Sequence, residues 1–79
     1  MLEFGKRYTW QEIVDTYPNR YVFVTDLDED DKGRRESAIF LDAATFEERG
    51  DKAKALSAKG IEFSLFWTKG PTEDWRILF

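Results

Sequence analysis

The side chains with the clearest capacity for chemistry lie in an acidic run in the first half of the chain. The run consists of Asp26, Asp28, Glu29, Asp30 and Asp31. Carboxylate oxygens suit calcium, but an EF-hand loop also needs a glycine at its sixth position and a glutamate at its twelfth. Counted from Asp26, those positions hold Asp31 and Ser37. The run therefore does not predict a calcium site, and no metal ligand is assigned.

Two interpretations of the acidic run stay open. In the first, the run is the solvated tip of a hairpin, where Lys32, Arg34 and Arg35 offset part of the repulsion. Exposed ion pairs of this kind contribute less than ~1 kcal/mol each. In the second, the run is a partner-binding loop that presents carboxylates to a basic surface and raises the rate of association.

The composition argues against catalysis and against a bound cofactor. Histidine and cysteine are both absent, which removes the commonest general base and the thiol nucleophile. The carboxylate pairs Glu47-Glu48 and Glu73-Asp74 are adjacent in the sequence, and neighbouring side chains seldom point into one pocket. The sequence contains no glycine-rich phosphate loop. We therefore expect no enzyme activity, no catalytic residue and no cofactor.

Length and charge limit the class of partner. The 79 residues predict one domain, residues 1–79. A net charge of −4 disfavours direct binding to nucleic acid and to anionic membrane surfaces. No window approaches the ~18 apolar residues of a membrane span, and the lack of cysteine suits a reducing, cytoplasmic compartment. The partner that we expect is another protein.

A helix is predicted near the start of the chain. Thr9 and Glu12 have the spacing of a capping box, in which each side chain satisfies the other residue's backbone amide. Pro18 ends the helix, because the residue before a proline avoids the α region. The predicted helix spans residues 9–17, and the apolar residues 2–4 form either a short strand or a packed arm.

Two strands are predicted after this helix. Residues 20–27 and 36–42 are rich in β-branched and aromatic side chains, which favour strands. We expect these strands to pair as a hairpin around a charged loop over residues 28–35, which is long for a hairpin connection.

A second helix and a second pair of strands complete the chain. Residues 45–59 are helical in composition, although Gly50 costs about 1 kcal/mol relative to alanine and leaves open a helix that is broken there. Gly60 suits the position that follows a helix. Alternating apolar residues then predict strands over residues 61–68 and 74–79.

These elements define the expected fold class, a single α+β domain in the order α-β-β-α-β-β. Consecutive hairpins favour a four-stranded antiparallel or mixed sheet with two helices packed on it. If both helices cover one face, the other face exposes some of the residues Val22, Val24, Phe40, Phe66 and Leu78. An apolar patch of this kind marks a partner or dimer interface. The alternatives are that the N-terminal arm covers this face, or that the helices divide between the two faces.

The stretch TWQEIVDTYPNRYVFVTDLDED, followed shortly by Gly33, resembles a group of small uncharacterised bacterial proteins. Those proteins share a Thr-Trp-x-Glu-Ile helix, a Tyr-Pro stop, an aromatic-aliphatic strand and an acidic loop that ends in glycine. The resemblance covers Thr9 to Gly33 and implies a bacterial or mobile-element origin. It names no catalytic residue.

The sequence favours a non-catalytic protein-binding module, a small bacterial or phage accessory or inhibitor protein. Its predicted contact residues are the acidic run together with Phe40 and Phe66 on the sheet. One alternative is an acidic nucleic-acid mimic that inhibits a host-defence nuclease, of the anti-CRISPR or anti-restriction type. Another is a self-associating structural domain whose apolar face pairs with a second copy to form a homodimer.

Overall fold

The computed structural model describes residues 1–68, and the strand predicted over residues 74–79 lies outside this part of the chain. The helices are α1 (Trp10–Thr16) and α2 (Arg49–Ala58), and the strands are β1 (Lys6–Thr9), β2 (Tyr21–Glu29), β3 (Arg35–Ala44) and β4 (Ser64–Trp67). They follow one another in the order β1-α1-β2-β3-α2-β4. The predicted α+β class is therefore confirmed, although the chain opens with a strand and not with a helix.

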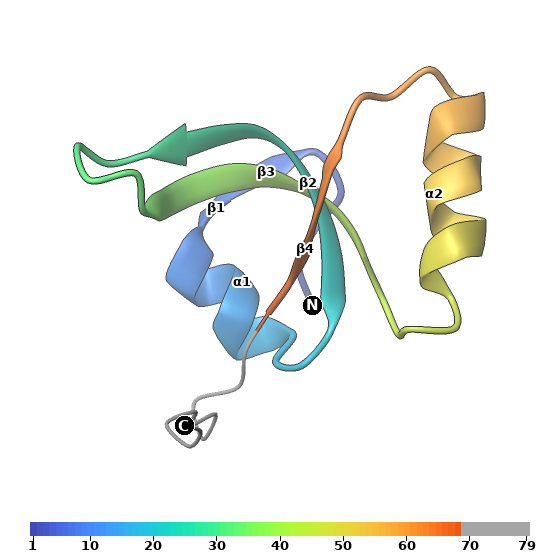
Figure 1. The fold of residues 1–79 in the computed structure, drawn as a ribbon, viewed down its shortest axis with the longest axis horizontal. Coiled ribbons are helices and arrows are strands. Elements are labelled where there is room, and N and C mark those ends of the chain that lie inside the picture. Colours follow the sequence, from blue (N-terminus) through green and yellow to red (C-terminus); the bar gives the residue numbers. More distant parts are fainter. Residues whose placement is uncertain (69–79) are drawn as a thin grey trace.

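The strands of the described residues form one antiparallel sheet in the spatial order β1-β3-β2-β4 (Figure 1). The long strands β2 and β3 occupy its centre, and the short strands β1 and β4 lie outside them. The sequence does not predict β1, because the residues KRYT show no apolar alternation. This strand forms through its backbone pairing with β3, which runs from Lys6 opposite Phe40 to Thr9 opposite Ser37.

The two helices pack against opposite faces of the sheet (Figure 1). α1 connects β1 to β2, and α2 connects β3 to β4, so each connection passes over one strand in the same direction along the sheet. The two crossovers, β1-α1-β2 and β3-α2-β4, start from strands that run in opposite directions, because β1 and β3 are antiparallel. If both crossovers have the same hand, their helices must therefore lie on opposite faces of the sheet. The expectation of a helix-free apolar face is therefore wrong, and the alternative that the helices divide between the faces is confirmed.

Each face of the sheet has its own apolar core. The core beneath α1 contains Ile13, Val22, Val24, Ala38 and Phe40. The core beneath α2 contains Phe23, Leu41, Ala44 and Leu56. β2 contributes to both cores, because successive side chains of a strand point to opposite faces. Burial on both sides explains why this strand is apolar throughout its first half.

Both helices lie within the predicted segments. Thr9 caps α1 and forms the predicted capping box with Glu12. α2 begins at Arg49, later than predicted, and continues through Gly50 without a break. Gly60 follows it with a φ of 75°, a conformation that glycine adopts at no steric cost. Neither helix in residues 1–68 has the length and apolarity needed to cross a membrane.

Candidate functional site: a cleft between the hairpin and helix α1

The β2–β3 hairpin closes with a tighter turn than the sequence predicts. The backbone N–H of Asp30 donates to the carbonyl oxygen of Arg34 at 2.9 Å, and the N–H of Gly33 donates to the carbonyl oxygen of Asp30 at 3.0 Å. Gly33 has a φ of 79°, as the last residue of a three-residue hairpin loop requires. Most of the charged residues predicted as loop therefore belong to the strands or close the turn.

Asp30 holds this turn together. Its carboxylate accepts hydrogen bonds from the backbone N–H groups of Lys32 and Arg34, both at 2.9 Å, and from Nε of Arg34 at 3.0 Å. The backbone N–H of Arg34 is the main cause that lowers the pKa of Asp30 below its ordinary value, since a donated hydrogen bond favours the charged carboxylate. The turn fixes where β3 begins and hence where Arg35 lies.

Helix α1 places Trp10 beside the hairpin. The hydroxyl of Thr9 accepts a hydrogen bond from the N–H of Glu12 at 3.1 Å, and Oε1 of Glu12 accepts one from the N–H of Thr9 at 2.9 Å. This capping box stabilises the first turn of a helix of only seven residues. Trp10 is the first residue of that helix, and its half-buried ring packs against the core beneath α1.

Strand β4 brings Phe66 to the same place. β4 pairs with β2 so that Phe66 lies opposite Val22, on the face of the sheet that α1 covers. The rings of Trp10 and Phe66 meet edge to face, with centroids 5.6 Å apart and an interplanar angle of 82°. This is a preferred arrangement for an aromatic pair, and it joins segments from the two ends of the described chain.

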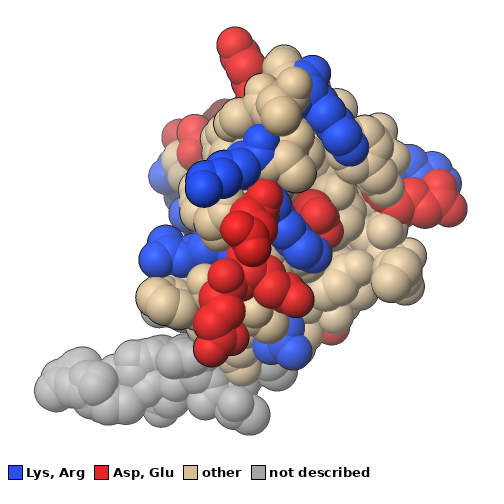
Figure 2. Space-filling view, turned by 90° about the vertical axis from the view of Figure 1, so that its right-hand side faces the viewer, with Lys and Arg blue, Asp and Glu red and all other residues tan. Residues whose placement is uncertain are grey.

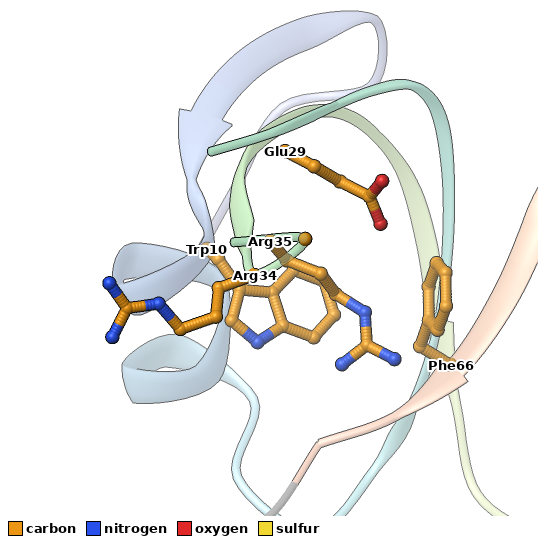
Figure 3. Close-up of a pocket in the computed structure, with 6 residues that line it drawn as sticks. Trp10, Glu29, Arg34, Arg35 and Phe66 are labelled. Atoms are coloured by element: carbon orange, nitrogen blue, oxygen red, sulfur yellow. The ribbon is translucent and has the colours of Figure 1, made fainter. Parts of the chain in front are cut away.

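The guanidinium of Arg35 lies over both rings. Its Cζ atom is 5.0 Å from the ring centre of Trp10 and 4.1 Å from that of Phe66, within the ~6 Å range of a cation–π interaction. Figure 3 shows the guanidinium between the two rings, with the carboxylate of Glu29 above it. Among residues 1–68, the side chain of Arg35 makes no hydrogen bond and no ion pair. The rings therefore position the cation, and no other residue of the described part uses its N–H donors.

These side chains line an open cleft of roughly 530 Å³. The lining residues are Trp10, Glu29, Gly33, Arg34, Arg35 and Phe66. The cleft offers two guanidinium groups, one carboxylate and two aromatic rings, and none of the lining side chains is a hydroxyl or thiol nucleophile. This combination suits a ligand that has both an apolar part and a polar or charged part.

Asp26 and Asp28 already have a partner within the fold. Arg7 of β1 lies with Nη2 at 2.5 Å from Oδ2 of Asp26 and with Nη1 at 3.4 Å from Oδ2 of Asp28. Nη2 also donates to the carbonyl oxygen of Asp26 at 2.9 Å. Asp26 has a φ of 52° and lies where the β2–β3 register shifts. Arg7 therefore stabilises an irregular segment of β2.

The predicted acidic run thus divides into separate roles. Asp30 holds the hairpin turn, Asp26 and Asp28 are paired across the sheet, and Glu29 lines the cleft. Asp31 is exposed at the turn, and its side chain has no hydrogen bond or ion pair with another residue of the described part. In that same part of the chain, no three acidic side chains gather as a metal site would require.

The two predicted sheet residues lie in different surroundings. Phe40 is 3% exposed and stacks on Tyr17, with ring centroids 5.3 Å apart. The prediction that Phe40 contacts a partner required a helix-free face, and α1 covers that face, so Phe40 is a core residue. Phe66 is half-buried and lines the cleft. Of the predicted contact residues, Glu29 and Phe66 are the two that line the cleft.

Sequence reasoning does not identify the other residues of the cleft. Trp10 has the pattern of a residue that packs a helix, and Arg34 and Arg35 have the pattern of charge compensation beside an acidic run. Their convergence on Phe66 depends on how β4 pairs with β2. No local spacing in the sequence signals that pairing.

A second arginine that lies over two rings is found outside the cleft. The Cζ atom of Arg49 is 5.2 Å from the ring centre of Tyr21 and 4.4 Å from that of Phe46, and Tyr21 also contacts the ring of Trp67. Phe46 is 63% exposed and Trp67 45% exposed. The two arginines make similar contacts with rings, but Arg35 lines the cleft described above and Arg49 does not.

No protein-family model, no curated protein and no solved structure matches the chain. The resemblance of Thr9–Gly33 to small bacterial proteins therefore stays a prediction. The function has to be inferred from the geometry and the charges of the cleft.

Proposed function

We propose that the chain is a non-catalytic protein-binding module that holds a segment of a partner protein in the cleft between the hairpin and α1. The main support is the guanidinium of Arg35, which lies over the rings of Trp10 and Phe66 and whose N–H donors bind no other described residue. Arginine and tryptophan are among the residues that most often anchor protein interfaces. Because the rings already hold Arg35, this side chain loses little conformational freedom when a partner binds.

The size and the lining of the cleft suit one short segment of a partner. A volume of roughly 530 Å³ is within the range of pockets that hold drug-sized ligands, and it accommodates a few side chains. An apolar side chain of the segment packs against the two rings. A polar group of the segment then lies within reach of Arg35 and Glu29, which Figure 3 shows close to those rings.

The non-catalytic role has support from residue types. The chain contains no histidine and no cysteine, and the lining of the cleft has a single carboxylate. The hydrogen bonds that lower the pKa of Asp30 make its carboxylate a weaker base, which is the opposite of what a general base at neutral pH needs. Binding without chemistry is the activity that this set of groups serves best.

The distribution of charge favours this proposal over mimicry of nucleic acid. Figure 2 shows that acidic side chains on the α2 side form a short column, with Lys and Arg side chains beside and above it. A mimic would present carboxylates at the positions of phosphates with few cations between them. A cleft that holds one segment of a partner is consistent with a bacterial or phage accessory protein that acts as an inhibitor or adaptor.

The proposal is tested by filling the cleft with a large side chain. Glu29→Trp places a ring among the lining residues, and Glu62→Trp makes the same change of charge at an exposed position before β4. We expect tagged wild-type protein and Glu62→Trp to capture the same partner from bacterial lysate, and Glu29→Trp to lose it. Mass spectrometry of the captured proteins measures the difference.

Amide spectra of the two variants first establish that each retains the fold of the wild type. A partner captured equally by both variants would show that binding uses another surface. In that case the exposed ring cluster around Tyr21 would become the better candidate.

A further inference from the structure

The charges of the cleft differ from those of the whole chain. The chain has a net charge of −4, yet the cleft contains two arginines and one glutamate. Arg34 gives its Nε–H to Asp30 at 3.0 Å, so part of its charge is already compensated within the hairpin. Arg35 makes no such bond with another described residue. Among the described residues, Arg35 is therefore the arginine of the cleft whose charge is not compensated by an ion pair.

On the basis of the proposed function, we infer that the bound segment presents one carboxylate, next to an aromatic or large apolar side chain, and that Arg35 binds that carboxylate. The N–H donors of a guanidinium lie in the plane of the group and point outward from its edge. Two of these donors match the two oxygens of a carboxylate in a bidentate pair. Because no other described residue uses these donors, they are available to bind this anion.

The partner's apolar group has a defined place as well. Trp10 and Phe66 meet edge to face, and both rings are only half-buried, so they keep apolar area toward the cleft. A ring or a large aliphatic side chain adjacent to the carboxylate covers this area and removes water from the ion pair. Loss of water strengthens the ion pair.

Glu29 favours a carboxylate over a phosphate. Its carboxylate lines the same cleft as Arg35, and it repels any anion that enters. The repulsion is greater for a phosphate monoester, which carries a charge of about −1.5 to −2 at neutral pH, than for a carboxylate of single charge. The balance of one unpaired guanidinium and one carboxylate therefore fits a single negative charge.

The inference is tested with a small probe that carries one ring and one carboxylate. Phenylacetate is titrated into the labelled protein, and the signals of the Arg35 Nε–H and the Trp10 indole N–H are followed by NMR. We expect saturable shifts of both signals at millimolar concentration, and about tenfold weaker binding of the neutral phenylacetamide. Phenyl phosphate, which keeps the ring but changes the anion, binds more weakly than phenylacetate.

Two arginine variants give the matched comparison. Arg35→Gln and Arg49→Gln each remove one guanidinium that lies over two rings. The Cζ atom of Arg35 is 4.1 and 5.0 Å from its two ring centres, and that of Arg49 is 4.4 and 5.2 Å from its two ring centres. Arg35→Gln should weaken phenylacetate binding about tenfold, whereas Arg49→Gln should leave it unchanged. Arg35→Lys keeps the charge and loses the planar fork, and it too should bind more weakly than the wild type.

The outcomes separate this inference from the proposed function. Equal binding of phenylacetate and phenylacetamide, or an unchanged affinity in Arg35→Gln, would overturn the inference about the carboxylate. Preference for phenyl phosphate would replace it with a phosphate ligand. If partner capture is lost in Glu29→Trp while phenylacetate fails to bind the wild type, the cleft is a protein-binding site for a segment of different chemistry. If Glu29→Trp keeps the partner, the proposed function itself is wrong.

Discussion

Carboxylates that are neighbours in the sequence serve different purposes at the scale of single residues. Asp30 accepts two backbone hydrogen bonds within the hairpin turn, whereas Asp26 and Asp28 bind Arg7 across the sheet. Glu29 lies between them in the sequence and lines the cleft. Alternation along a strand accounts for part of this division, because neighbouring side chains point to opposite faces.

The hydrogen bonds to Asp30 predict an effect of pH on the hairpin. Since its pKa is lowered in the folded chain, the stabilisation is complete above the ordinary aspartate pKa of about 3.9. It is lost as the pH falls through the lower value of the folded chain. We expect the amide signals of Lys32 and Arg34 to shift together with the Asp30 carboxyl in that acidic range. NMR titration measures this, and a pKa of Asp30 at or above 3.9 would contradict it.

Arg7 should contribute measurably to stability although it lies near the surface. It makes an ion pair with each of two aspartates and a hydrogen bond with a backbone carbonyl, and its side chain is 37% exposed. We expect Arg7→Gln to lower the free energy of unfolding by about 1 kcal/mol. Lys6→Gln is the control, because within residues 1–68 the side chain of Lys6 makes only an exposed pair with Glu3 at 3.8 Å. Equal urea midpoints for the two variants would show that the Arg7 contacts add nothing.

At the scale of elements, the short helix α1 depends on its cap. Seven residues are too few for a helix to form alone, so the capping box and burial of Ile13 must supply its stability. We expect Thr9→Ala to lower the free energy of unfolding by about 1 kcal/mol and Thr9→Ser to retain most of it. Urea denaturation measures both. A loss as large in Thr9→Ser as in Thr9→Ala would mean that the cap hydrogen bond is not the cause.

Elements with local signals are the ones that the sequence predicts well. The spacing of Thr9 and Glu12 and the stop at Pro18 predict α1 closely, and Gly60 ends α2 as expected. β1 and the charged ends of the hairpin are not predicted, because backbone pairing and the contacts of Arg7 hold them. Those stabilising groups come from residues that are distant in the sequence.

The residues of the candidate site are likewise predicted only where the sequence carries a local signal. The sequence identifies Glu29 and Phe66 as candidates, yet it gives no reason to join them with Trp10 and Arg35. That union requires the hairpin turn, the helix cap and the β2–β4 register at once. A site assembled from three elements in this way leaves no motif in any one of them.

At the scale of the whole molecule, the division of the helices between the faces decides which aromatic residues are structural. Phe40 is covered by α1 and is 3% exposed, whereas Phe46 is 63% exposed. We expect Phe40→Ala to lower the free energy of unfolding by roughly 3–5 kcal/mol. Phe46→Ala should change it by less than about 1 kcal/mol. Comparable losses in the two variants, measured by urea denaturation, would contradict the assignment of Phe40 to the core.

The central claim is that a partner protein binds in the cleft, and site-specific photo-crosslinking tests it most directly. p-Benzoylphenylalanine is introduced at Glu29, which lines the cleft, and separately at Glu62, which is exposed outside it. We expect irradiation in bacterial lysate to give one discrete adduct from position 29 that an excess of unlabelled wild-type protein abolishes. Position 62 should give no such adduct. The same adduct from both positions, or none from position 29 while a partner is still captured, would show that the cleft is not the binding site.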